Sequence, residues 1–310
     1  MYNKKVNLIL LFIAFISLGI QAQQDALYSQ YMFNPLSINP AYAGTRNAIS
    51  GVMLHRQQWV GIDGAPKTTS LAVHSPIKGK NFALGLNLLT EKIGPTNNST
   101  ILGTYAYHLN LGKGKLSFGL RGGIYSTELR SNELHYTNSQ ADENAVYRSL
   151  TPNFDFGAYY HTDKFYVGGS ANHLGNPKLK LSNNVESIEL VGHYMAFIGN
   201  AFVLTPNLVV KPSAIVKYTS AAPLNYDINT SILFYKTLWL GASYRSSVAS
   251  EKESSIVFIA EFNLSESFRF GYSYDYNLGS LRKYSSGSHE VFIGADLYSG
   301  RKKSISPRYL

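Results

Sequence analysis

Histidines are the residues of this sequence best suited to bind a metal or transfer a proton, and eight of them are spread along 310 residues. None has the His-Glu-x-x-His spacing of a zinc site, and the chain contains no cysteine. His289 and Glu290 lie among serines, which are residue types that hydrolases use, but no nucleophile elbow or paired base accompanies them. The sequence therefore predicts no catalytic, metal or cofactor-binding residue, and the protein is not expected to be an enzyme.

A glycine-rich basic run, Gly112-Lys113-Gly114-Lys115, could in principle hold phosphate. It lacks the spacing of a P-loop and a helix after it, so we interpret it as a turn. The formal net charge is +9, but basic residues are scattered and form no stripe before Arg301, Lys302 and Lys303. This distribution favours a protein beside anionic lipid or wall polymer over one that binds nucleic acid.

The composition indicates β-structure at an interface. Charged residues make up 15% of the chain, against about 25% in typical soluble domains. The chain has 23 tyrosines, 16 phenylalanines and 26 glycines, and tyrosine places a polar hydroxyl on an apolar ring.

The segment from Phe268 to Tyr276 shows the pattern most clearly, because its aromatic residues all occupy one parity. The other parity holds Arg269, Gly271, Ser273 and Asp275. Side chains of a strand alternate between two faces, so this strand has an aromatic face and a polar face. The aromatic face suits either the core of a soluble sandwich or the lipid side of a membrane barrel.

Similar segments recur along the chain. They are 47–57, 67–75, 81–90, 98–109, 114–126, 152–161, 164–172, 190–202, 206–218, 225–235, 237–246, 254–263, 267–276 and 288–298. Their length near ten residues matches the roughly 9–11 that a tilted strand needs to cross a bilayer. Short links follow the even strands and long links the odd ones, as in outer-membrane barrels. The sequence thus predicts an all-β transmembrane antiparallel up-and-down β-barrel of about 14 strands.

Charges on these segments gather on the parity that would face the lumen. They are Arg121, Asp155, Lys211, Lys217, Asp227, Arg245, Glu261, Arg269, Asp275, Glu290 and Asp296. Arg or Lys on the lipid face would cost about 2–4 kcal/mol at mid-bilayer. We therefore expect Tyr272→Arg to block assembly and Ser273→Arg to be tolerated. Pro212, in mid-strand, predicts a bulge because it removes a ladder hydrogen bond.

The amino end has the form of a secretory signal. Lys4 and Lys5 precede an apolar run from Leu8 to Ile20, which is shorter than a spanning helix. We expect a cleaved signal peptide at 1–22, a periplasmic N-terminal segment at 23–46, an outer-membrane barrel at 47–298 and a periplasmic C-terminal tail at 299–310. The segment 23–46 is too apolar for an idle tail, and it either plugs the lumen or docks a periplasmic partner.

Several motifs resemble the PorP/SprF family of type IX secretion system outer-membrane proteins of Bacteroidetes. The most specific are YSQYMFNPLSINPAYAG at 28–44 and RQQWVGIDGAPKT at 56–68. Others are YAYHLNLGKGKLSFGLRGGI at 105–124, DKFYVGGSANHL at 163–174 and GYSYDY at 271–276. The resemblance covers nearly the whole chain after the signal.

The resemblance implies a non-enzymatic barrel of the bacterial cell outer membrane. Such a protein would bind, help to secrete and anchor a cargo protein with a C-terminal sorting domain at the cell surface, in some members for gliding motility. It would also contact periplasmic, peptidoglycan-linked secretion machinery. The outer loops, especially 57–66 and 127–151, would face the cargo. A general diffusion porin for small solutes is the alternative function, since barrels of this size lie between packed small barrels and open porins.

The candidate partner-binding residues come from the N-terminal segment and the first long link. They are Tyr31, Phe33, Asn34, Pro35, Asn39, Pro40, Tyr42, Arg56, Gln57, Gln58, Trp59 and Asp63. Trp59 suits either an aromatic belt at the membrane interface or a partner contact.

Overall fold

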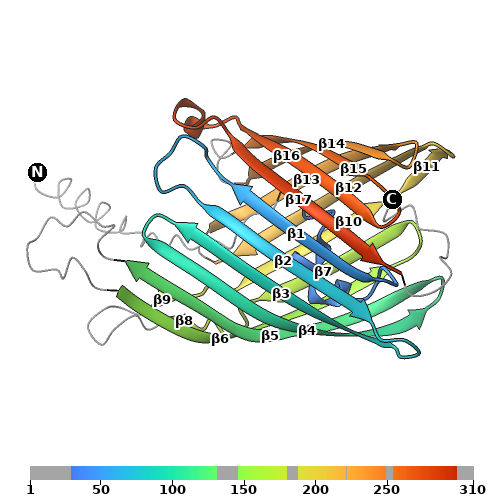
Figure 1. The fold of residues 1–310 in the computed structure, drawn as a ribbon, viewed down its shortest axis with the longest axis horizontal. Coiled ribbons are helices and arrows are strands. Elements are labelled where there is room, and N and C mark those ends of the chain that lie inside the picture. The colour runs from blue at the N-terminus through green and yellow to red at the C-terminus, as the bar shows by residue number, and fades with distance from the viewer. Residues whose placement is uncertain (1–28, 131–145, 180–187, 221, 249–253, 299–310) are drawn as a thin grey trace, which may run out of the picture.

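The computed structural model describes residues 29–130, 146–179, 188–220, 222–248 and 254–298. In these ranges one antiparallel sheet closes into a barrel (Figure 1). Its strands are β1 (Ile49–Gln57), β2 (Lys67–Pro76), β3 (Phe82–Ile93), β4 (Thr96–Leu111), β5 (Gly114–Arg130), β6 (Val146–His161), β7 (Phe165–Asn172), β10 (His193–Asn200), β11 (Phe202–Thr205), β12 (Leu208–Thr219), β13 (Ala222–Phe234), β14 (Leu238–Ser247), β15 (Ser255–Asn263), β16 (Phe268–Asn277) and β17 (Ser288–Leu297). The smaller elements are the hairpin strands β8 (Lys178–Leu179) and β9 (Ile188–Glu189), and the short helices α2 (Pro35–Ile38), η1 (Pro40–Tyr42) and η4 (Ser280–Lys283).

The barrel has fourteen strand positions, because β10 and β11 follow one another along the same edge of β12. Sequence neighbours pair around the ring, and β1 pairs with β17 to close it. Each of the fourteen predicted segments corresponds to one of these positions, so the predicted fold class is confirmed. The longest strands are β4, β5 and β6, which are 16, 17 and 16 residues long and extend beyond their predicted limits.

The two faces of the wall are those that the alternation predicted. In β16 the side chains of Phe268, Phe270 and Tyr272 are exposed on the outside, whereas Arg269 and Asp275 are buried inside. The other charges of the predicted lumen-facing parity are also buried, with Lys217 half-buried. An apolar outer face meets hydrocarbon without exposing charge, which is the arrangement of membrane-spanning barrels.

The links differ from the predicted strict alternation at two places, between β3 and β4 and between β12, which ends at Thr219, and β13, which begins at Ala222. Long links join β1 to β2 and β16 to β17, and we name this end of the barrel the long-loop end and the other the short-turn end. However, Gly94-Pro95 alone joins β3 to β4 at the long-loop end, because both strands extend beyond their predicted limits. Val203 to Thr205, predicted as a turn, belong to β11, and the turn at the short-turn end is Pro206-Asn207.

The predicted bulge at Pro212 is wrong. The pairing of β12 with β13 runs without a shift through Pro212 and Thr230, and the irregularity lies between Lys217 and Thr219. The neighbouring strand is interrupted instead, at Ala201 between β10 and β11, and pairing with β12 resumes in the same register. The interruption lies beside Pro212, which has no N–H to donate to a ladder.

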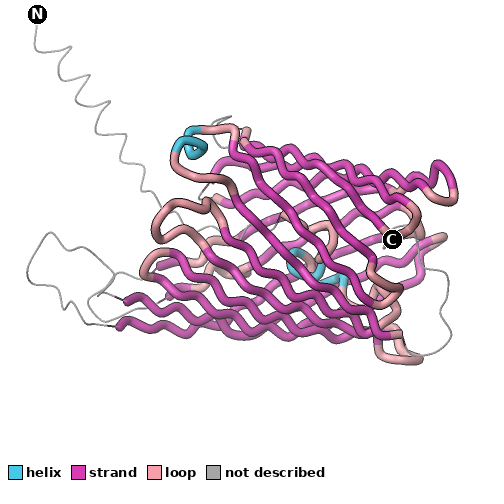
Figure 2. Tube along the Cα trace, turned by 45° about the horizontal axis from the view of Figure 1, so that its top comes forward, coloured by secondary structure: helices cyan, strands magenta, loops and turns pink. Residues whose placement is uncertain are grey.

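The described part of the N-terminal segment, residues 29–46, lies inside the barrel. Figure 2 shows α2 and η1 surrounded by strands on all sides. The predicted signal peptide at 1–22 and the tail at 299–310 lie outside the described residues. No helix in the described ranges has the length and hydropathy to cross a bilayer.

Candidate functional site

The interior of the barrel is occupied by residues 29–48, which we name the plug. The Ser29 amide donates to the carboxylate of Glu290 over 2.9 Å, close to the long-loop end of β17. At the other end of the same strand, Arg46 Nε lies 3.4 Å from Asp296 Oδ2. The plug therefore crosses the lumen lengthwise, from the long-loop end to the short-turn end, before β1 begins at Ile49.

Asn-Pro pairs give the plug its local structure. Pro35 and Pro40 stand at the first turns of α2 and η1, where a missing N–H costs no hydrogen bond. The Asn39 side chain accepts from the Ala41 amide over 2.9 Å and so caps η1. Gly44 has a φ of 76°, a conformation that favours glycine. This part of the chain thus consists of two short helices and a tight turn.

A first ion cluster holds the beginning of the plug. Its members come from five different strands and are Arg56, Asp227, Arg245, Asp275 and Glu290. Arg56 bridges two carboxylates, with 2.8 Å from Nη2 to Asp275 and 3.1 Å from Nη1 to Glu290. Arg245 lies 3.3 Å from Asp275 and 3.1 Å from Asp227.

The backbone of the plug completes this first ion cluster. The Ser29 and Gln30 amides donate to the two oxygens of Glu290 over 2.9 and 2.8 Å, and Ser29 Oγ donates to Asp275 over 2.7 Å. Arg56 Nη1 in turn donates to Ser29 Oγ over 2.6 Å. Removing one member of a buried ion pair typically costs about 3–5 kcal/mol, because its partner stays charged and buried. The first ion cluster therefore fixes where the plug starts.

A second anchor binds the end of α2 to β5, β6 and β7. Arg121 Nε contacts Asp155 over 2.6 Å, and Arg121 Nη1 donates to the carbonyl of Leu36 over 3.0 Å. Ser170 Oγ donates to the carbonyl of Ile38 over 2.6 Å. The last carbonyls of a helix lack partners within the helix and carry partial negative charge, so a guanidinium is a suitable ligand for them.

A third anchor lies at the short-turn end. Asp296 accepts from Arg269 Nη1 over 2.8 Å and also contacts Arg46 and the Ser50 hydroxyl. The Gly44 amide donates to His74 Nδ1 over 3.0 Å. The plug is thus held by polar contacts at both ends and in the middle.

Aromatic packing fills the space between these anchors. Phe33 lies with its ring centroid 5.9 Å from that of Phe292 and 6.3 Å from that of Trp239, which is fully buried. Lys211 Nζ lies 4.3 Å from the Trp239 ring centroid, within the range of a cation–π contact. Tyr31 is also buried in the lumen.

Two glycines of the wall make room for the plug. Gly119 and Gly157 are cross-strand partners in β5 and β6. A methyl group on Gly119 would overlap the backbone of Pro40 and Ala41, and one on Gly157 would overlap the Asn39 side chain. The plug therefore fits a wall that is shaped to its backbone.

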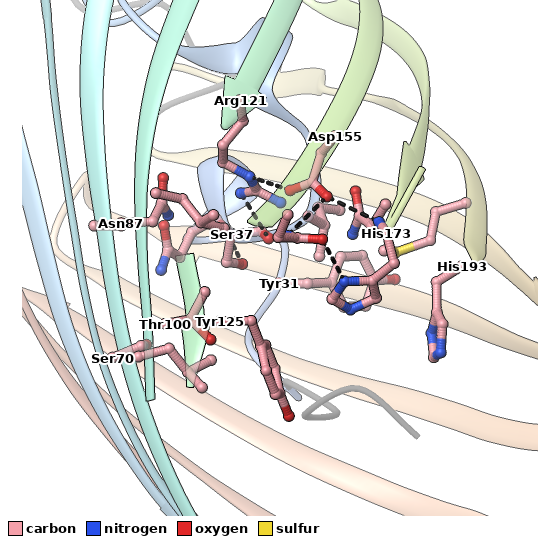
Figure 3. A pocket seen from close by; sticks show the side chains of 18 of the residues that line it. Tyr31, Ser37, Ser70, Asn87, Thr100, Arg121, Tyr125, Asp155, His173 and His193 are labelled. Atoms are coloured by element: carbon pink, nitrogen blue, oxygen red, sulfur yellow. Dashed lines mark hydrogen bonds and ion pairs between the residues drawn. The ribbon is translucent and has the colours of Figure 1, made fainter. Parts of the chain in front are cut away.

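A cavity of about 150 Å³ remains on the long-loop side of the plug. Figure 3 shows Tyr31 and Ser37 of the plug facing wall residues of the cavity, with the Arg121–Asp155 pair beside Ser37. Most polar groups of the lining are hydroxyls and amides, such as Thr100 and Asn87. Among the described residues, no three His, Asp or Glu side chains are placed to hold a metal ion.

Most of the candidate partner-binding residues lie in the lumen. Those that are buried are Tyr31, Phe33, Asn34, Asn39, Pro40, Tyr42, Arg56 and Gln58. Pro35, Gln57 and Trp59 are half-buried, and Asp63 is exposed. Gln57, Gln58, Trp59 and Asp63 lie at the long-loop end, Arg56 is a member of the first ion cluster, and the others belong to the plug. Partner binding by these residues stays a prediction.

The sequence did not identify the wall residues that hold the plug. Asp227, Arg245, Asp275 and Glu290 were recognised only as lumen-facing charges. A signal was present, because the lumen-facing set contains both signs in nearly equal number, and buried charges need partners. Pairing between strands so far apart in the chain has no local pattern that would reveal it.

Comparison with known proteins gives one family and one fold. The family model of the type IX secretion system membrane protein PorP/SprF matches residues 20–295. A search among curated proteins found no match. The CymD monoaromatic hydrocarbon channel is similar in structure, with a TM-score of 0.55, 13% identity, and coverage of 92% of this chain and 98% of that one. The toluene transporter TbuX of Ralstonia pickettii has a TM-score of 0.50, 10% identity, and coverage of 92% and 98%. At these identities the two structures show the fold alone.

Proposed function

Because the chain belongs to the PorP/SprF family of type IX secretion system membrane proteins, we propose that it binds a partner cargo protein, helps to secrete it and anchors it at the cell surface. The cargo would carry a C-terminal sorting domain, and the short-turn end would contact periplasmic, peptidoglycan-linked machinery. The protein would act by recognition and not as an enzyme, in some settings as part of gliding motility.

The occupied lumen is the observation that carries this proposal. A solute channel needs a continuous water-filled path, whereas the plug fills this barrel and is bonded to the wall at three levels. The parts of the chain left to contact other molecules are the two ends and the outer face. The long-loop end presents Trp59 and Asp63 in a loop whose backbone is fixed by two hydrogen bonds between Val60 and the β16–β17 link.

Those two bonds make the long-loop end a composite surface. The Val60 amide donates to the Gly287 carbonyl over 2.8 Å, and the Ser286 amide donates to the Val60 carbonyl over 2.8 Å. The same surface includes the exposed side chain of Tyr284. An ordered surface with an exposed tyrosine and a half-buried tryptophan suits a protein partner, because little conformational entropy is lost on binding.

Removal of the gene from the producing bacterium tests the proposal. We expect one large surface protein to disappear from the cell surface. The double variant Asp63→Arg with Tyr284→Ala should reduce the amount of this protein at the surface while the barrel still assembles. The control is Ile228→Val with Ile293→Val, two changes on the outer face in mid-strand, away from both ends of the barrel. An unchanged set of surface and secreted proteins after gene removal would refute the proposal.

A further inference from the structure

The plug begins close to the long-loop end of the barrel. The Ser29 amide donates to Glu290 over 2.9 Å, and Glu290 is the third residue of β17 counted from that end. The Ser29 hydroxyl donates to Asp275 over 2.7 Å, and Asp275 is the third residue from the end of β16. Arg56, whose Nη1 donates to the same hydroxyl, is the last but one residue of β1. Because a strand rises by about 3.3 Å per residue, Ser29 lies roughly 7 Å along the strands from their long-loop ends.

From Ser29 the chain runs away from this end. Arg46 Nε lies 3.4 Å from Asp296 Oδ2, at the opposite end of β17. The first strand, β1, then begins at Ile49 at the short-turn end. The plug therefore passes through the lumen once, in one direction, and the residues that precede Ser29 reach it from the side of the long-loop end.

The lumen beyond Ser29 is taken by the plug itself. The side chains of Tyr31, Phe33, Leu36 and Ile38 are buried between the plug and the wall. The cavity of about 150 Å³ beside them lies on the long-loop side. A second stretch of chain that ran back to the short-turn end would have to displace these packed side chains, which interiors tolerate poorly. The residues before Ser29 are thus directed out of the barrel through the long-loop end.

We propose that the chain enters its barrel from the cell-surface side, so that the residues before Ser29, and the amino terminus that removal of the signal leaves, lie outside the cell. Barrels of this class have short turns in the periplasm and longer loops outside, which assigns the long-loop end to the cell surface. From the sequence, the segment 23–46 was expected to be periplasmic. The proposal replaces that expectation for the residues before Ser29.

The amino end would emerge beside the composite surface. Arg56, which contacts Ser29, is followed three residues later by Trp59, whose amide donates to Ser288 Oγ over 3.1 Å. The first ion cluster therefore lies next to the loop that carries Trp59. This position brings the amino terminus close to the surface that the proposed function gives to a partner, although the proposal itself does not depend on that function.

Single-cysteine labelling tests the proposal, because the chain contains no cysteine of its own. The variants are Ala26→Cys, Asp63→Cys in the exposed loop at the long-loop end and Lys113→Cys in an exposed turn at the short-turn end. Each full-length variant is treated in the producing bacterium with a membrane-impermeant maleimide, before and after the outer membrane is permeabilised. We expect Ala26→Cys to react in intact cells to the same extent as Asp63→Cys, and Lys113→Cys to react only after permeabilisation.

Two results would overturn the proposal. One is reaction of Ala26→Cys only after permeabilisation, as for Lys113→Cys. The other is reaction of Lys113→Cys but not of Asp63→Cys in intact cells, which would reverse the orientation of the barrel. If Ala26→Cys reacts in neither condition, a hydrophilic epitope inserted between residues 25 and 26 decides. Antibody binding to intact cells then supports the proposal, and binding only after permeabilisation contradicts it. Labelling does not require a cargo, so this result is independent of the proposed function.

Discussion

At the residue scale, most of the charged side chains inside the barrel contact a partner of opposite sign or a backbone group of the plug, as buried charges require. Arg56 shows this most clearly, since its guanidinium contacts two carboxylates and the Ser29 hydroxyl while its side chain is almost fully buried. Exposed pairs of the same chemistry contribute little, because water screens them.

Replacing Arg56 by methionine should destabilise the protein by about 3–5 kcal/mol, because Asp275 and Glu290 would remain buried without their bridging guanidinium. The fluorescence of the buried Trp239 reports unfolding in urea after reconstitution into vesicles. The control is Arg148→Met, whose side chain is 74% exposed and should change stability by less than about 1 kcal/mol. Equal losses in the two variants would contradict the role given to the first ion cluster.

Gly119→Ala should displace the plug, because the added methyl group would overlap the Pro40–Ala41 backbone. Overpacking of this kind typically costs about 1–3 kcal/mol. Gly103→Ala is the matched control, since a methyl group at Gly103 would meet only an ordinary contact at 3.8 Å. Proteolysis that cuts within the plug in Gly119→Ala and spares Gly103→Ala is the expected result. The same protection in both variants would show that the fit at Gly119 is not needed.

At the scale of elements, the strands could be predicted and the course of the plug could not. Alternation between faces is local, so each of the segments such as Phe268 to Tyr276 carries its own signal. The plug depends on contacts such as that of Ser29 with Glu290, 261 residues apart. The aromatic residues of this segment indicated that it is buried. They did not decide whether it is buried in the lumen as a plug or against a periplasmic partner.

The sequence gives one prediction for each face of β16, and the presence of the plug alters the second of them. Tyr272→Arg should block assembly because it puts a charge on the lipid face, at a cost of about 2–4 kcal/mol. The expected tolerance of Ser273→Arg assumed a water-filled lumen, yet Ser273 is fully buried. We now expect Ser273→Arg to impair folding also, as measured by the heat-modifiable migration of the barrel on gels. Normal assembly of Ser273→Arg would show that the lumen at this level is open to water.

At the scale of the whole molecule, the closed barrel and the plug inside it bear on whether the protein passes solutes or binds partners. The closed barrel could be predicted from the number of strands and the alternation of link lengths. The plug in the lumen was one of two alternatives for the N-terminal segment, the other being a segment that docks a periplasmic partner. The candidate site residues were predicted mainly as contacts for other proteins; most of them belong to the plug and lie in the lumen, and partner binding by them stays a prediction.

The wild-type protein in planar bilayers should show no stable open conductance, because the plug blocks the lumen. Deletion of residues 29–46 should produce conducting barrels, once folding is verified by gel migration. If the deletion variant does not fold, Gly119→Ala with Gly157→Ala provides the second test, since both changes displace the plug. Steady conductance of the wild-type protein would favour the porin function.

The seam between β1 and β17 has a consequence for biogenesis. Residues on both strands contact the amino-terminal segment, Arg56 on β1 and Glu290 and Asp296 on β17. Because the segment is bonded to both strands of the seam, we expect it to lie on the concave side of the unrolled sheet before the two edges pair. A nascent chain stopped before Ser288 would then be an open trough that holds its own amino end, and arrival of the last strand would be the step that encloses it.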